Sequence, residues 1–325
     1  MDRAGTAPPV SAASAWKIAS ALAAIYLVWG STYLAIGVAV ESMPPLLMAG
    51  ARFLLAGGLL YTLVRWRGAR APTRAQWRGA AVVGTLLLLG GNGLVCLAER
   101  TVASSLAALL VATVPLWMVL VPWLAGGERP QLRTLAALAT GLAGVAVLAG
   151  PGGDHLVDWK SAGLLLAAAL SWALGSLYAR RQQDAPPPLV SASLHMLCGG
   201  AALTLAGGLD GEFAGGGLQA ISPASGLSFA YLATFGSMVG FGSYVWLLRH
   251  TSATLATSYS YVNPLVALLL GCWLHHEPLA PVTPLAAALI VGAVAVMSRP
   301  GSPPRPARPG AGARAPILCE NEDSL

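Results

Sequence analysis

TSATLATSYSYVNPLVALLLGCWLHHEP, residues Thr251 to Pro278, is the stretch that decides the fold of this chain. It is long and apolar enough to cross a membrane, yet its first half is rich in hydroxyl and aromatic side chains. Four polar residues follow the i, i+3, i+4, i+7 spacing of one helix face: Thr254, Thr257, Ser258 and Tyr261. Pro264 lacks a backbone N–H and its ring clashes with the Ser260 carbonyl, which predicts a break in the helix. A polar stripe beside a broken helix is tolerated in a membrane where it faces protein or a water-filled cavity.

An apolar run with a similarly placed proline occurs earlier, at residues 104–130 (SSLAALLVATVPLWMVLVPWLAGGERP). Its Pro115 lies 149 positions before Pro264. Other matches follow in the same order at offsets of 143 to 149, among them Gly30-Ser31 with Gly175-Ser176, Pro-Pro-Leu at 44–46 with 187–189, and Arg52 with His195. Five predicted helices in each copy is an odd number, so the second copy must enter the membrane from the opposite side. The pattern predicts an inverted repeat with a site near the midplane.

The two copies differ in their polar residues. Where the second copy has its polar stripe, the first has Ser105, Ala108, Leu109 and Ala112. We therefore expect the second half to supply more of any specificity-determining face.

The composition is that of an integral membrane protein. Of the 325 residues, 56% are hydrophobic and only 10% are charged, with a mean hydropathy of +0.66, whereas soluble domains carry about 25% charged residues. The pI near 9.4 is explained by arginines between apolar segments rather than by nucleic-acid binding. The four cysteines form no CxxC or Cys/His pattern with ligand spacing, so neither a disulfide framework nor a zinc site is indicated.

A membrane-spanning helix needs about 20 apolar residues, and ten ranges qualify: roughly 18–38, 45–64, 79–98, 102–124, 132–150, 161–179, 188–208, 226–248, 253–273 and 280–298. They predict an all-α integral membrane protein of ten transmembrane helices in two inverted five-helix repeats. The predicted domains are a disordered cytoplasmic N-terminus (1–16), the first repeat (17–150), the second repeat (151–298) and a disordered cytoplasmic tail (299–325).

The distribution of basic residues predicts the orientation. With the N-terminus in the cytoplasm, sixteen of the 19 Lys and Arg residues fall on the cytoplasmic side and only Arg100 and Lys160 on the outer side. This agrees with the positive-inside rule and predicts cytoplasmic termini. The apolar run after Lys17 is too long for a signal peptide, so we expect it to be retained.

Enzyme signatures are mostly absent. Neither lysine follows a glycine, so the sequence has no GxxxxGK phosphate loop, and it has no HExxH or GxSxG motif. Gly90-Gly91-Asn92-Gly93 lies in an apolar run and favours close helix packing over a phosphate cradle. No catalytic set, metal site or cofactor is expected.

Aromatic residues of the first predicted helix mark a candidate wall of a substrate cavity. Tyr26, Trp29 and Tyr33 follow the i, i+3, i+7 spacing of a helix face, and Trp29 lies mid-span, away from the interfacial belts. Two interpretations stay open, tight packing between helices and the lining of a cavity. Candidate lining residues in the other helices are Arg52, Asn92, Trp172, Ser176, His195, Tyr244, Thr257, Ser258, Tyr259, Tyr261 and Asn263.

Three titratable residues are candidates for charge or proton chemistry. Arg52 lies about seven residues into its helix, ~10 Å deep, so it either snorkels outward or faces a cavity and attracts an anionic group. His195, at the matching position of the second repeat, is either a proton-coupling site or a hydrogen-bonded buried histidine. Glu99 shares a helix face with Asn92 and is either a proton-coupling site or a solvated partner of Arg100.

Short motifs follow one another over roughly residues 18–298: Trp29-Gly30-Ser31-Thr32, Arg52-Phe53, Ala98-Glu99, Pro115 with Gly127-Glu128-Arg129, the run from Ser171 to Ser176, and Asn263-Pro264-Leu265 with Glu277-Pro278. In this order they resemble the EamA-type members of the drug/metabolite transporter superfamily. The resemblance implies inner-membrane metabolite transport, often efflux of amino acids or small amphipathic compounds, through a cavity built from helices 1–4 and 6–9. The first helix lacks the carboxylate that couples protons in the small four-helix multidrug relatives, which leaves Glu99 and His195 as coupling candidates.

We therefore expect a multi-pass plasma (inner) membrane transporter that works by alternating access, with Pro115 and Pro264 as hinges. Its expected partners are a small-molecule substrate and the lipid bilayer, without nucleic acid, and helices 5 and 10 could form the face of a homodimer. The alternative is a membrane-embedded metabolite-binding or sensory protein without flux, which a flux assay would separate from a transporter.

Overall fold

The structure is a computed structural model that describes residues 15–102, 104–149, 159–213, 221–275 and 283–298. Within these ranges every regular element is a helix. The predicted disordered tails fall outside them, except that Ala15 and Trp16 already belong to the first helix. His276 and the predicted helix-ending Glu277 also lie outside the described residues.

The first half of the chain runs through α1 (Ala15–Val40), α2 (Pro45–Trp66), α3 (Arg74–Gly84), the π-helix η1 (Thr85–Gly93), α4 (Leu94–Ala98), α5 (Ser104–Val111), α6 (Val114–Leu124) and α7 (Leu132–Ala149). The second half runs through α8 (Trp159–Arg181), α9 (Pro188–Leu209), α10 (Pro223–Tyr231), the π-helix η2 (Leu232–Phe241), α11 (Gly242–His250), α12 (Ala253–Ala256), α13 (Tyr259–His275) and α14 (Thr283–Ser298).

Seven helices among the described residues are long and apolar enough to cross a membrane: Ala15–Val40, Pro45–Trp66, Arg74–Ala98, Ala107–Leu124, Trp159–Arg181, Pro188–Leu209 and Pro223–His250. α7, α13 and α14 are not among the seven, although each overlaps a range that the sequence predicts to span the membrane. Length and composition therefore support an all-helical membrane protein.

Local signals in the sequence explain several helix boundaries. Pro45 occupies the first position of α2, where its missing N–H has no intrahelical partner to lose. α3 begins with a capping box, in which the Thr73 side chain accepts from the Gln76 N–H and the Gln76 side chain accepts from the Thr73 N–H. Gly68, just beyond α2, has a φ of 85°, a left-handed conformation that favours glycine.

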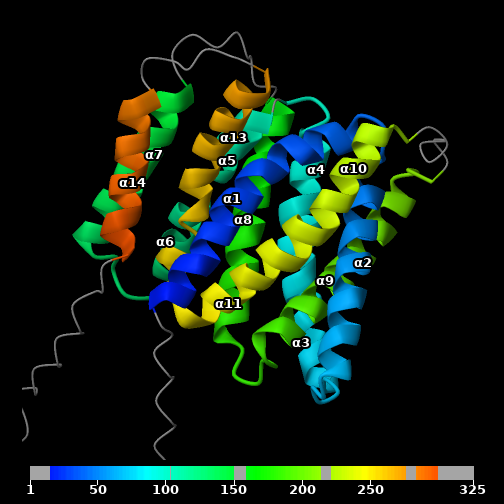
Figure 1. Cartoon of the computed structure of the whole chain (residues 1–325). Coiled ribbons are helices and arrows are strands. Elements are labelled where there is room, and N and C mark those ends of the chain that lie inside the picture. The colour runs from blue at the N-terminus through cyan, green and yellow to red at the C-terminus, as the bar shows by residue number, and fades with distance from the viewer. Residues whose placement is uncertain (1–14, 103, 150–158, 214–220, 276–282, 299–325) are drawn as a thin grey trace, which may run out of the picture.

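The helices of the two halves are interlocked. α1 packs against α10, η2 and α11 on one side and against α13 on the other, and it runs diagonally across the front of the molecule in Figure 1. In the corresponding way, α8 packs against η1 and α4 and also against α5 and α6. The α7–α14 pair lies at one edge of the molecule (Figure 1), outside the bundle that the other helices form.

α2 and α9 pack against each other more closely than side chains would normally allow. A Cβ atom on Gly200 would lie 2.9 Å from the Leu54 nitrogen and 3.1 Å from the Gly50 carbonyl oxygen. Small residues permit this approach of two backbones, which is a common way to associate helices in lipid.

The fourth and ninth predicted spans are both broken, but at different places relative to their prolines. α6 begins at Val114, with Pro115 in its first turn, so the break precedes that proline as expected. In the ninth span the prediction is wrong, because Pro264 lies inside α13 and the break falls at Thr257 and Ser258.

Hydroxyl groups explain why the ninth span breaks early. Thr257 Oγ1 donates to the Ala253 carbonyl at 2.9 Å, and Ser258 Oγ donates to the Leu255 carbonyl at 2.7 Å. Such local side-chain to backbone bonds compete with continuation of a helix. Consequently the four residues of the predicted polar stripe do not share one continuous helix face.

Two π-helical segments occupy corresponding places in the two halves. η1 begins at Thr85 and η2 at Leu232, an offset of 147 residues, within the 143 to 149 of the sequence matches. π-helical turns are rare and occur frequently at functional sites. Neither segment was predicted from the sequence.

Candidate functional site

A cavity opens where both halves of the chain meet. It is lined from α1, α2, η1, α4, α5, α8, η2 and α13. Seven of the residues singled out from the sequence line it: Trp29, Tyr33, Arg52, Asn92, Trp172, Tyr259 and Asn263. Of the three aromatic residues predicted on α1, Trp29 and Tyr33 line the cavity and Tyr26 does not.

Trp29 is the centre of an aromatic cluster at this cavity. Its ring centroid lies 4.7 Å from that of Tyr259 and 5.5 Å from that of Trp172, both in edge-on geometry. Pairs of this kind contribute about 0.5–1.5 kcal/mol each beyond the burial of their area. The Trp29 indole Nε1 also donates to the carbonyl of Gly236 in η2 at 3.0 Å, which fixes the ring against the other half of the chain.

Tyr244 and Ser176 support this cluster from behind instead of lining the cavity. The Tyr244 ring is fully buried and its hydroxyl accepts a 2.9 Å hydrogen bond from Trp172 Nε1. Ser176 Oγ lies 2.6 Å from the same hydroxyl. These contacts hold the Trp172 ring in the cavity wall, so the predicted lining role of Tyr244 and Ser176 becomes a positioning role.

Arg52 faces the cavity and does not snorkel to the surface. Its side chain is only 3% exposed, its Nη2 donates to Asn92 Oδ1 at 2.7 Å, and its guanidinium carbon lies 4.5 Å from the centroid of the Phe53 ring. Arg52 Nε is buried and has no hydrogen-bond partner within the described part of the chain. Asn92 Oδ1 also lies 3.5 Å from the Cys96 sulfur, which extends this polar contact along η1 and α4.

Glu99 is buried, so the interpretation as a solvated partner of Arg100 is wrong. Its side chain is 7% exposed, whereas Arg100 is exposed. Neither carboxylate oxygen has a hydrogen-bond partner among the residues that the structure describes. Glu99 does not line the cavity itself, but it follows directly on α4, which supplies Val95 to the cavity wall.

His195 lies outside the cavity. It is 3% exposed, and its ring packs edge-on against Phe241 at a centroid distance of 6.3 Å. Phe241 does line the cavity and therefore lies in the wall between the two. His195 Nδ1 is buried and has no hydrogen-bond partner in the described residues.

The polar stripe of the ninth span divides between different surroundings. Ser258 Oγ lies 2.6 Å from the Tyr26 hydroxyl, which joins α1 to the turn before α13, and none of Tyr26, Thr257 and Ser258 lines the cavity. Tyr261 packs with Leu138 of α7 and Ile290 of α14 and does not line the cavity. Because the helix restarts at Tyr259, it is Tyr259 and Asn263, four residues apart, that line the cavity.

Sequence reasoning missed several lining residues that carry little chemical signal, namely Thr32, Ile36, Phe53, Gly91, Val95, Val111, Ala168, Gly236 and Phe241. Phe53 follows Arg52 directly in the sequence, and this adjacency could have identified it. Gly91 confirms the expected packing role of its glycine run, because a Cβ there would lie 2.6 Å from the Trp172 ring.

The helices are those of a membrane protein, and comparison with known proteins defines its class. The EamA-like transporter family matches residues 16–150 and again residues 159–299. The chain belongs to this family and contains two copies of its repeat.

Individual relatives agree with this assignment. The chain is 42% identical over 280 residues to the uncharacterized inner membrane transporter YedA of Escherichia coli (strain K12), covering 86% of this chain and 89% of YedA. It is 29% identical over 287 residues to a probable amino-acid metabolite efflux pump of Salmonella typhimurium, covering 82% and 90% of the two chains. A crystal structure with 22% sequence identity shares the fold with a TM-score of 0.69, over 88% of this chain and 97% of the other.

Proposed function

We propose that this protein is a secondary transporter that exports amino acids or other small amphipathic metabolites by alternating access at the central cavity. The observation that carries the proposal is a cavity walled by both halves of the chain, with aromatic rings beside the buried Arg52, the half-buried Asn92 and the buried Asn263. Such a wall suits a molecule with an apolar body and a polar end. The family and the names of its relatives make export of small metabolites the natural direction to test first.

The proposal includes ten transmembrane helices arranged as two inverted repeats. The packing supports this arrangement, because exchanging the two halves maps the contact of α1 with η2 onto that of α8 with η1, and the contact of α2 with α9 onto itself. The pair of α7 and α14 is likewise its own counterpart. A pseudo-twofold axis in the membrane plane would relate the halves in this way and would pass close to the cavity.

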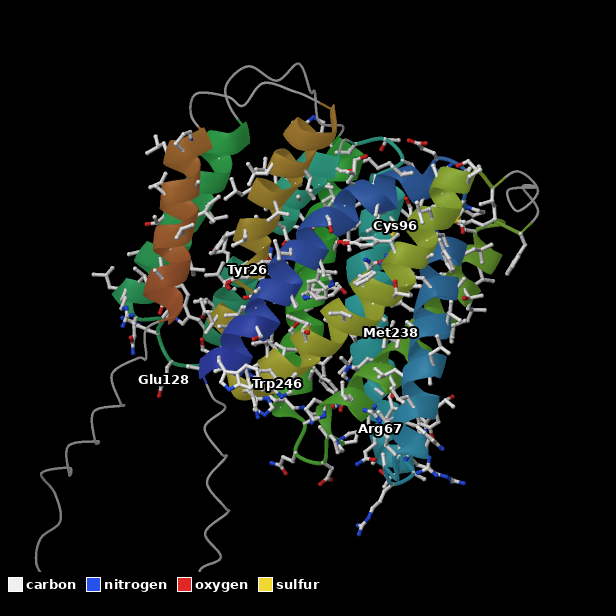
Figure 2. The ribbon with its side chains drawn as sticks, in the orientation of Figure 1. Tyr26, Arg67, Cys96, Glu128, Met238 and Trp246 are labelled. Atoms are coloured by element: carbon white, nitrogen blue, oxygen red, sulfur yellow. The ribbon has the colours of Figure 1, made fainter. Side chains whose placement is uncertain are left out.

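Cytoplasmic termini complete the proposed topology. In Figure 2, Arg67, Glu128 and Trp246 all lie toward one end of the molecule. The sequence assigns that end sixteen of the basic residues, and the positive-inside rule makes it cytoplasmic. The cavity then lies between the cytoplasmic and outer ends, in the plasma (inner) membrane.

The elements that would move are the broken fourth and ninth spans together with the first helices of each half. Pro115 and Pro264 remain the proposed hinge positions, now joined by the break at Thr257 and Ser258. These segments contact α1 and α8 directly, so a small rotation there would open or close the cavity.

Glu99 is the preferred candidate for proton coupling. Its carboxyl group is buried, has no hydrogen-bond partner in the described chain and lies one residue beyond the helix that lines the cavity. His195 is the weaker candidate, since the Phe241 ring lies between it and the cavity.

A homodimer through the exposed edge of α7 and α14 is also part of the proposal.

The direct test uses the purified full-length protein in liposomes loaded with labelled L-phenylalanine or L-leucine. We expect efflux that depends on the protein, saturates with substrate concentration and is accelerated by unlabelled substrate on the opposite side. Binding of these amino acids without flux from the liposomes would contradict the proposal and favour a non-transporting binding or sensory protein.

A further inference from the structure

The cavity holds one fixed positive charge whose hydrogen bonding is incomplete. Arg52 has a single hydrogen bond from its guanidinium, to the neutral Asn92 side chain, and its Nε is buried without a partner among the described residues. A buried charge that no opposite charge contacts is costly, and removing it from water demands compensation. At membrane depth such residues commonly face a cavity and mark a substrate pathway.

The nearby carboxyl group does not supply the missing partner. Glu99 is buried, yet neither of its oxygens accepts a hydrogen bond from Arg52 or from any other described group. Asn92 contributes only its amide oxygen to Arg52, and the Phe53 ring packs against the guanidinium without neutralising its charge. Glu99 therefore interacts with the guanidinium only electrostatically, and the two groups in direct contact with it are neutral, so its unpaired donor stays available to an anion.

We propose that Arg52 binds a carboxylate of the ligand, so that the cavity selects amphipathic molecules bearing a carboxylate over neutral molecules of the same shape. A guanidinium matches a carboxylate in plane and can donate two parallel hydrogen bonds to it. The inference deepens the transport role proposed above and rests on it, but the binding preference can be measured without transport.

The surroundings of Arg52 define the rest of the ligand. Phe53, Phe241 and Trp172 line the same cavity, with ring centroids of Phe241 lying 6.4 Å from both of the others. An apolar or aromatic body attached to the carboxylate would pack against these rings. The ligand is therefore oriented, with its carboxylate toward α2 and its body toward α8 and η2.

The test compares probes that differ only at the acidic group. Binding of 3-phenylpropionate and of its amide, 3-phenylpropionamide, is measured by isothermal titration calorimetry on the purified full-length protein. We expect the wild-type protein to bind the acid at least about tenfold more tightly than the amide, because a site built for a polar group discriminates strongly against an analogue that lacks it. Equal affinity for the two probes would overturn the proposal without any variant being needed.

Variants then assign the preference to Arg52. Arg52→Gln should lower affinity for the acid by at least about tenfold and leave affinity for the amide within about threefold. Arg52→Lys should retain part of the preference for the acid, because it keeps the positive charge but lacks the paired donors of the planar guanidinium. Arg249→Gln is the matched control, since Arg249 bonds the Pro186 carbonyl and Ser191 outside the cavity. Equal loss for both probes in Arg52→Gln would indicate a structural role and contradict the inference.

The outcome for transport is read separately in liposomes. Acid-selective binding without flux of either probe would remove the proposed transport role and leave the carboxylate site standing. Flux of both probes at equal rates, unchanged by Arg52→Gln, would remove the carboxylate site and leave the transport role standing.

Discussion

At the scale of single residues, the buried polar side chains around the cavity carry most of the chemistry. Arg52 and Asn92 were identifiable from the sequence because charged and amide groups inside apolar runs are rare and demand partners. The structure adds which of their atoms have hydrogen-bond partners. The spacing of residues in the sequence could not show this. His195 shows the limit of matching repeats, because it occupies the position corresponding to Arg52 but lies behind Phe241.

Glu99→Gln should remove any dependence of transport on a proton gradient, because the amide cannot take up and release a proton as the carboxyl group does. Binding of L-phenylalanine should stay within about threefold, because the amide keeps the shape of the carboxyl group. Liposome efflux with and without an imposed pH gradient measures this. His195→Gln is the comparison, and we expect it to keep the dependence. A Glu99→Gln protein that still accelerates in the gradient would exclude Glu99 as the coupling group.

Trp29→Phe should slow transport. The change keeps an aromatic ring but removes the hydrogen bond to the Gly236 carbonyl, leaving a buried acceptor without its donor at a cost of about 1–3 kcal/mol. Because that bond joins α1 to η2, we expect a several-fold lower efflux rate. Initial rates in liposomes, normalised to inserted protein, give the result, and an unchanged rate would show that this contact is not used in the transport cycle.

At the scale of elements, the sequence located the helices better than it located their irregularities. The broken fourth span was predicted from Pro115, which lies in the first turn of α6, where proline is well tolerated. The break in the ninth span was misplaced, because Thr257 and Ser258 bond backbone carbonyls of α12 and end that helix before Pro264. The two π-helical segments have no sequence signature at all, since their apolar residues fit an α-helix equally well.

Pro264→Ala should alter transport rates more than membrane insertion. The alanine restores a donor for the Ser260 carbonyl and removes the ring that disturbs α13, so the segment becomes stiffer. We expect an efflux rate changed by about threefold or more, with the same amount of inserted, folded protein by size-exclusion chromatography. Full retention of transport would remove Pro264 from the hinge.

The close approach of α2 and α9 predicts a stability difference between two glycines of the same bundle. Gly200→Ala places a Cβ 2.9 Å from the Leu54 nitrogen, so overpacking should lower stability by about 1–3 kcal/mol. At Gly58, also in α2, a Cβ would have nothing within 4 Å, and Gly58→Ala should leave the melting temperature unchanged or raise it. Equal melting temperatures for the two variants in detergent would contradict the α2–α9 packing.

At the scale of the whole molecule, composition and internal matches indicated a duplicated membrane protein, and the family match to two segments confirms the duplication. The cavity lies where the two copies meet, with lining from both halves. Of the residues proposed for it, those on α1, α2, η1 and α8 could be chosen from helix position and chemistry. Phe241 and Gly236 could not, because their role depends on how η2 crosses α1.

Alternating access requires that one cavity between the two halves is reached from each side of the membrane in turn. Labelling a cysteine in the wall of this cavity tests that claim most directly. Ala168→Cys lines the cavity, and Ala173→Cys in the same helix is buried away from it. Both are made with Cys96, Cys198, Cys272 and Cys319 replaced by serine. In right-side-out and inside-out vesicles, a membrane-impermeant thiol reagent should modify Ala168→Cys from both sides and Ala173→Cys from neither. Modification of Ala168→Cys from one side only, with and without L-phenylalanine, would contradict alternating access.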